Sequence, residues 1–94
     1  MSSWTIEGDY EADGAVCVRG AFTPEQIGWA TEAIDENLAD LSPRAKRASA
    51  DSDGAFIEDF CNWNRLPAME RFIKESPGAE IAAELTHSDT VRLY

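Results

Sequence analysis

The sequence contains a single histidine, His87, and this scarcity excludes several kinds of active site from these residues alone. A Ser-His-Asp catalytic triad needs a histidine as its general base, and one histidine of unknown role is not enough to argue for such a triad. His87 and Asp89, separated by Ser88, have the His-x-Asp spacing of two of the three ligands of a 2-His-1-carboxylate iron site, but that site needs a second, distant histidine. We therefore interpret residues 87–89 as a turn after a helix, whose dipole favours a histidine at its C-terminal end.

Basic residues and cysteines are scarce as well. Eight Lys and Arg side chains stand against 18 Asp and Glu, which gives a formal net charge of −10. Such a surface repels phosphate backbones and anionic lipid, so we expect no nucleic-acid partner and no membrane partner. The two cysteines, Cys17 and Cys61, are too few for the disulfide framework of a small secreted domain. We interpret both as reduced thiols of a cytoplasmic protein.

Long hydrophobic runs are also missing. No stretch approaches the roughly 18 consecutive apolar residues of a membrane-spanning helix. Residues 1–14 have neither the basic start nor the apolar segment of a secretory signal. With 94 residues, of which 44% are hydrophobic, the chain has the composition of one small globular domain or of part of a larger one.

The elements that the sequence does indicate begin with a short strand and a helix. Residues 15–19 alternate between faces, with two valines on one side, and predict a half-buried strand. Residues 23–41 predict a helix, because Thr23 is a good N-cap, a proline occupies the first helical position, and Gln26 completes a capping box. One apolar stripe runs along this helix: Ile27, Ala30, Ile34, Leu38 and Leu41. The acidic residues fall largely outside the stripe, and we expect them in solvent.

Residues 42–55 are small and polar, and they predict a mobile surface loop. Asp51, Asp53 and Gly54 fit three positions of a calcium-binding loop. Its twelfth position is Phe60, however, where such a loop needs a bidentate glutamate. The sequence therefore does not predict a calcium site.

The C-terminal third predicts two short helices and a strand. Pro67 starts the first helix, and Ser76 and Pro77 break it and start the second as N-cap and first helical residue. The side chains expected to point inward are Met69, Phe72, Ile73, Ile81 and Leu85. Residues 90–94 alternate as a strand. Two short strands make no stable sheet by themselves, so we expect an α+β fold, mainly helical, in which residues 1–94 are a single incomplete domain.

Trp63, Asn64 and Arg65 are candidates for contact with a substrate. An aromatic residue followed by two polar ones, between a hydrophobic run and a proline, can line a pocket wall. The alternative is that Trp63 belongs to the core and Asn64 caps the next turn. Cys61 has no assigned base nearby, so we interpret it as a buried and inert thiol.

Taken in order, three segments resemble the N-terminal part of a phytanoyl-CoA dioxygenase-like, iron(II)/2-oxoglutarate-dependent oxygenase. Residues 13–27, DGAVCVRGAFTPEQI, are similar to the family's opening Asp-Gly, short Val-rich strand and first helix. Residues 56–85, FIEDFCNWNRLPAMERFIKESPGAEIAAEL, resemble its segment with a Trp, then a Pro, then a pair of helices. Residues 91–94, VRLY, resemble the first core strand of its barrel.

This resemblance implies a double-stranded β-helix (jelly-roll) fold and hydroxylation of a small organic or acyl substrate by the full-length enzyme, with iron(II) and 2-oxoglutarate as cofactors. The family's iron and 2-oxoglutarate ligands normally lie further along the chain, and none of them matches a position here. His87 and Asp89 precede the strand instead of following it. The resemblance thus implies a structural segment that is inactive alone, binds no cofactor alone, and has the rest of the barrel as its partner. Tyr94 then joins Trp63, Asn64 and Arg65 as a residue near the substrate mouth.

A second hypothesis comes from a different class of protein. The chain can be a small acidic interaction module without enzymatic activity, whose apolar helix faces bind a partner chain or a second copy. Strand edges left without partners at residues 15–19 and 90–94 favour such pairing.

Overall fold

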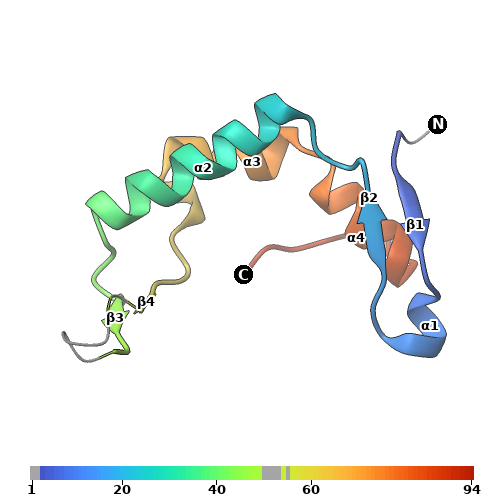
Figure 1. The fold of residues 1–94 in the computed structure, drawn as a ribbon, viewed down its shortest axis with the longest axis horizontal. Helices are drawn as coiled ribbons and strands as arrows, with labels where there is room; N and C mark the ends of the chain where they lie inside the picture. Colours follow the sequence, from blue (N-terminus) through green and yellow to red (C-terminus); the bar gives the residue numbers. More distant parts are fainter. Residues whose placement is uncertain (1–2, 50–53, 55) are drawn as a thin grey trace.

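A computed structural model describes residues 3–49, 54 and 56–94 of the chain. Helices and two small antiparallel sheets are spread along one long axis, with a hairpin towards each end (Figure 1). The extents are 44 × 28 × 25 Å and the radius of gyration is 15.8 Å. A compact chain of this length has a radius of gyration of about 12 Å. The fold is therefore open, with much of its surface far from any core.

The N-terminal hairpin pairs β1 (Thr5–Glu7) with β2 (Cys17–Arg19) in antiparallel register. The predicted strand is confirmed over its last three residues, but its partner β1 was not predicted. A one-turn helix, α1 (Tyr10–Asp13), lies in the connection between the strands and was also not predicted. It ends at Gly14 with a φ of 74°, a conformation that favours a residue without a Cβ. Three residues are too few for β1 to show a clear alternation.

The long helix α2 (Pro24–Ala39) confirms the capping prediction. The backbone N–H of Gln26 donates to Thr23 Oγ1 over 3.1 Å, and the Thr23 N–H donates to Gln26 Oε1 over 3.0 Å. These bonds satisfy backbone donors that a helix start otherwise leaves free. The start of α2 is therefore determined by neighbouring residues of the sequence and does not depend on packing against other elements.

A second hairpin follows α2. Its strands are β3 (Lys46–Arg47) and β4 (Ile57–Glu58), which pair antiparallel. The prediction of a loop over residues 42–55 is therefore wrong at β3, because this charged dipeptide shows no strand pattern and becomes a strand only through a partner that lies ten residues on. Asp51 and Asp53, the candidate calcium ligands, and part of the predicted mobile loop lie outside the described residues.

Two short helices follow a single 3-10 turn, η2 (Trp63–Arg65). The predicted pair is confirmed as α3 (Pro67–Glu75) and α4 (Gly78–Thr86), with the break at the expected proline. The caps are shifted by one residue. Ser76 closes α3, since its N–H still bonds within that helix, and Pro77 is the N-cap of α4.

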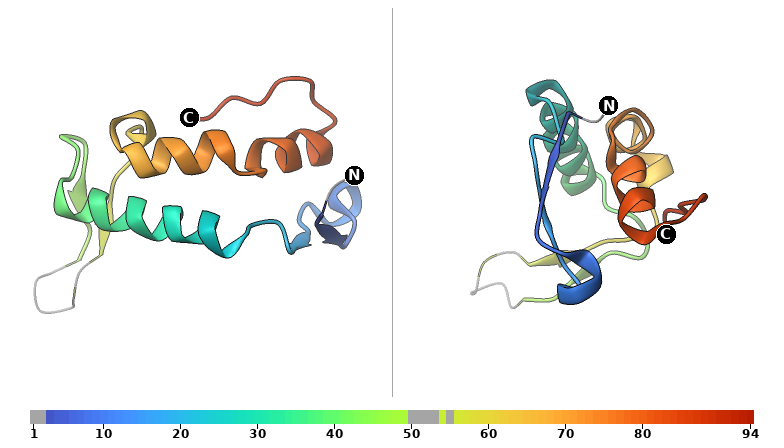
Figure 2. Two further views of the ribbon diagram at one scale, coloured as in Figure 1. Left: turned by 90° about the horizontal axis from the view of Figure 1, so that it is seen from above. Right: turned by 90° about the vertical axis from the view of Figure 1, so that its right-hand side faces the viewer.

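The predicted strand over residues 90–94 is absent. These residues run back alongside α4 and α3, without strand pairing, towards the start of α3 (Figure 2). No edge of either described sheet lies beside them, so their alternating sequence has no ladder to join. The turn before them is confirmed, because His87 is the C-cap of α4 in the left-handed conformation, with a φ of 53°.

The core lies between α2 and α3 and is made largely of small residues. Ala33 on α2 is fully buried, and Ala68 on α3 is 7% exposed. Leu66 closes one end at 4% exposure, and the rings of Phe22 and Phe72 meet at the other end with centroids 5.3 Å apart. Among the described residues, no large side chain is completely buried.

No helix over residues 3–49, 54 and 56–94 has both the length and the apolar character needed to cross a bilayer.

Candidate functional site

One candidate interaction surface is the face of α2 that carries its branched aliphatic residues. We call Ile27, Ile34, Leu38 and Leu41, the last just beyond the helix, the α2 stripe. Their exposed fractions are 55%, 56%, 56% and 37%. The sequence placed these residues on one face correctly, yet this is not the face that packs on α3.

Helix geometry explains the difference. Successive residues are rotated by about 100°, so Ala33 lies about 120° round the helix from Ile27. The α3-facing side is built from Ala33 and Trp29, and the Arg71 guanidinium lies 4.1 Å from the centre of the Trp29 ring. Alanines let the two helices approach closely. As a result α2 buries its small residues and leaves its larger aliphatic ones in solvent.

The accessible surface of the whole chain shows the same imbalance. It is 6934 Å², against about 5,400 Å² for a typical folded protein of 10.4 kDa. The excess of about 1,500 Å² is about twice the roughly 800 Å² that each partner buries in a standard protein–protein interface. Other large apolar side chains in the described residues are also exposed: Tyr10, Phe22, Phe56, Phe60, Val91, Leu93 and Tyr94.

Arg65, one of the predicted substrate-side residues, is committed to holding α2. Its Nη2 donates to the carbonyl of Asp40 over 2.6 Å, and its Nη1 lies 3.0 Å from the Asp40 carboxylate. Nη2 also reaches Asn37 Oδ1 at 3.4 Å. These contacts satisfy acceptors at the C-terminus of α2, where a positive charge also suits the helix dipole. Arg65 is thus a positioning residue in this structure.

The other two candidates of this segment, Trp63 and Asn64, differ from each other in exposure. Trp63 is half-buried, and Asn64 is exposed. No side chain caps the start of α3, so the alternative role of Asn64 as a cap is not found. The buried polar residue of this segment is Asn62, whose amide donates to Asn37 Oδ1 over 2.8 Å. Sequence reasoning passed over Asn62 because its partner lies 25 residues away.

A polar lock joins the segment after α2 to the segment before η2, and sequence reasoning missed it. The Ser42 N–H donates to Asp59 Oδ2 over 2.8 Å, and the Ser42 hydroxyl also donates to this carboxylate. The hydrogen bond from the Ser42 hydroxyl, with backbone donors from Ser42 and Phe60, holds the pKa of Asp59 below its usual value of 3.8. Arg44 Nη2 donates to the carbonyl of Cys61 over 2.7 Å. These bonds fix the position of η2.

Tyr94 is 91% exposed, but its hydroxyl interacts with the thiol of Cys61, which lies just before η2. The hydrogen bond with Cys61 raises the pKa of Tyr94 above its ordinary value of 10.0. Cys61 is half-buried and has a positive φ of 55°. The structure therefore brings Tyr94 to the segment that leads into Trp63.

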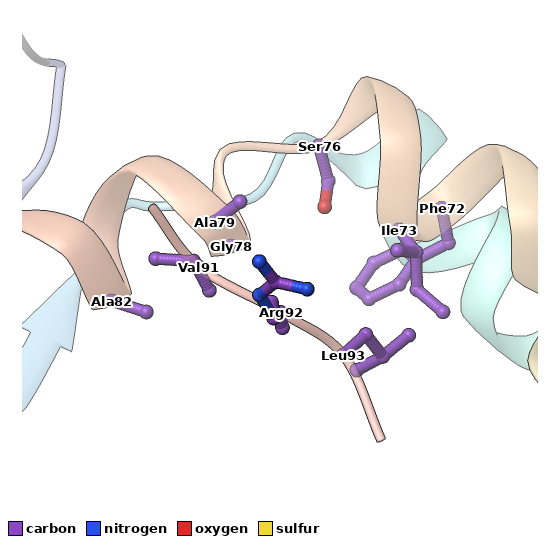
Figure 3. Close-up of a pocket in the computed structure, with 9 residues that line it drawn as sticks. All are labelled: Phe72, Ile73, Ser76, Gly78, Ala79, Ala82, Val91, Arg92 and Leu93. Carbon is purple, nitrogen blue, oxygen red and sulfur yellow. The ribbon is translucent and has the colours of Figure 1, made fainter. Parts of the chain in front are cut away.

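A concave site lies where the terminal residues cross the bend between α3 and α4 (Figure 3). We call it the α3–α4 pocket. Its volume is about 270 Å³. The residues that line it are Phe72, Ile73, Ser76, Gly78, Ala79, Ala82, Val91, Arg92 and Leu93. Sequence reasoning did not predict this pocket, because residues 91–93 were expected to form a strand.

A metal centre is not apparent in the described part of the chain. Over residues 3–49, 54 and 56–94, no three or more His, Cys, Asp or Glu side chains gather closely enough to hold a metal ion. His87 Nε2 lies 3.3 Å from Glu11 Oε1 instead, which links α4 to the N-terminal hairpin. Both side chains are more than three-quarters exposed, so this contact contributes little to stability.

The described residues therefore offer apolar surfaces and a pocket, and they bring together no cluster that could hold a metal ion. Comparisons with protein-family models, with curated proteins and with solved structures gave no match to this chain.

Proposed function

We propose that this chain is the N-terminal structural portion of an iron(II)/2-oxoglutarate-dependent dioxygenase of the phytanoyl-CoA dioxygenase-like kind. Its fold would be completed by a jelly-roll barrel, and the residues that bind iron and 2-oxoglutarate would follow Tyr94. The whole enzyme would hydroxylate a small organic or acyl substrate. Two things support the proposal: the ordered resemblance of the three sequence segments, and the uncovered α2 stripe.

The α2 stripe is the observation that carries the proposal. A helix with a complete capping box is well defined by its own sequence, yet its larger aliphatic residues face solvent. Burying a whole isoleucine or leucine is worth about 1.5–3 kcal/mol. Covering the exposed half of Ile27, Ile34 and Leu38 would therefore add about 1 kcal/mol each. A sheet face supplies a broad apolar surface for such a row of side chains.

The residues of this chain do not fit iron. The 2-His-1-carboxylate arrangement needs two histidines, and the one histidine here caps α4 and faces Glu11. We therefore assign no reaction step to these residues. Their part would be to support the barrel: α2 would pack on one sheet through its stripe, and Arg65 would hold α2 to η2.

Trp63 and Tyr94 stay proposed as residues near the substrate mouth, since Tyr94 reaches Cys61, two residues before Trp63. Asn64, which is exposed, stays with them. In the full enzyme, Trp63→Ala should weaken substrate binding or turnover. Unchanged binding and turnover in that variant would remove Trp63 from the proposal.

The experiment that tests the proposal is to read the source DNA past codon 94 and to measure the intact mass of the native product. We expect an open frame that encodes a Lys, then His-x-Asp, then a distal His, and a mass well above 10.4 kDa. A stop codon with a matching mass of 10.4 kDa would overturn it.

The same stripe also favours a second candidate, the acidic interaction module, whose α2 stripe would bind a partner chain or a second copy. Sedimentation of the purified chain separates the two candidates. A self-associating module should form a dimer that Ile34→Glu dissociates, whereas the oxygenase proposal expects a monomer that takes up no iron and consumes no 2-oxoglutarate.

A further inference from the structure

The α3–α4 pocket combines an apolar wall with one positive charge, and this combination indicates the chemistry of a ligand. Phe72, Ile73, Val91 and Leu93 supply aliphatic and aromatic surface. The Arg92 guanidinium projects into the middle of this surface (Figure 3). In a chain with ten more acidic than basic side chains, Arg92 still forms no ion pair with any described carboxylate.

Further hydrogen-bond donors converge on the same space. The Ser76 hydroxyl points towards Arg92 across the pocket and has no hydrogen-bond partner among the described residues (Figure 3). Gly78 and Ala79 line the pocket at the start of α4, which has no side-chain cap. The first described bond of that helix is from Ile81 N–H to Pro77 O, at 3.0 Å, so the amides of Gly78 and Ala79 stay available.

We propose that the α3–α4 pocket binds a small aliphatic carboxylate. Arg92 would bind the carboxylate through charge-assisted hydrogen bonds, and the Ser76 hydroxyl would add another. The alkyl chain would lie along Phe72, Ile73 and Leu93.

The size of the pocket sets the size of the ligand. A dry cavity of about 150 Å³ holds a benzene ring, and this pocket is about 270 Å³. Drug-sized ligands occupy roughly 300–1,000 Å³, so the occupant should be smaller than these. Octanoate, with an eight-carbon chain, is a suitable probe.

The test is a titration of the isotope-labelled chain with octanoate, followed by amide NMR shifts. We expect saturable shifts centred on Ser76, Gly78 and Ala79. Arg92→Gln should weaken octanoate binding by about tenfold or more, because it removes a charge-assisted contact. The matched control is Lys74→Gln, which removes the same charge from an exposed position on α3 outside the pocket and should leave binding unchanged.

Two comparison ligands separate this proposal from simple apolar adsorption. Octan-1-ol and octylammonium share the alkyl chain of octanoate but lack its negative charge, and they should bind at least tenfold more weakly. Equal binding of all three ligands would overturn the proposal. So would octanoate shifts that survive Arg92→Gln, or shifts that centre on the α2 stripe.

Discussion

Substitutions at two adjacent positions on α2 should change the free energy of unfolding by very different amounts. Ala33 is fully buried against α3, whereas Ile34 is 56% exposed on the α2 stripe. Ala33→Leu forces extra atoms into a closely packed contact, and such overpacking costs about 1–3 kcal/mol. Ile34→Ala loses only part of an incomplete burial and gains helix propensity, so its cost should stay within about 0.5 kcal/mol.

The assay is urea unfolding of the purified chain, followed by far-UV circular dichroism. With a slope of about 1 kcal/mol per molar urea, typical of a small domain, Ala33→Leu should lower the midpoint by roughly 1–3 M. It can even leave the chain unfolded in buffer, because so little apolar area is buried. Ile34→Ala should leave the midpoint nearly unchanged. An Ile34→Ala cost equal to or larger than the Ala33→Leu cost would refute the assignment of the two faces.

Two further predictions concern the polar contacts that position η2. Arg65→Gln should cost about 0.5–1.5 kcal/mol in the same unfolding assay, because it removes the hydrogen bond to the Asp40 carbonyl. Asp40→Asn should cost less, since it keeps that carbonyl and the Asp40 carboxylate is 82% exposed. Equal losses would mean that the ion pair matters more than the backbone contact. The pKa of Asp59 is lowered on folding, so Asp59 stabilises the fold above its unfolded pKa of 3.8 and loses this contribution as the pH falls below that value through the folded pKa. Below about pH 4, the free energy of unfolding should accordingly fall less steeply with decreasing pH in Asp59→Asn than in the natural chain. Identical pH dependences would contradict the role of the polar lock between Ser42 and Asp59.

Local signals in the sequence were enough to place the three longer helices, α2, α3 and α4. Thr23 and Gln26 define the start of α2 through bonds only three residues apart, and Pro77 enforces the break between α3 and α4. Both features depend on near neighbours in the chain, so they can be read without knowing the fold. The cap of α4 differed by one residue, because the Ser76 N–H still bonds within α3.

The features that sequence reasoning missed depend on distant partners. β3 becomes a strand only because β4 folds back on it, and Arg65 binds Asp40 across 25 residues. Periodicity showed which α2 residues share a face, but it could not show which face would meet α3. The face of α2 that carries Ala33 packs on α3, and the α2 stripe does not, because alanines permit a close approach of the two helices. The terminal residues alternate like a strand but have no edge to join.

The central claim is that the α2 stripe is a packing surface for the rest of a larger fold. Hydroxyl-radical footprinting with mass spectrometry tests it directly, by comparing Ile34 and Leu38 in the native gene product and in the purified 94-residue chain. The account predicts strong protection of both residues in the native product and unchanged labelling of Pro24, which is exposed at the start of the same helix. Equal labelling of Ile34 and Leu38 in the two samples would contradict it.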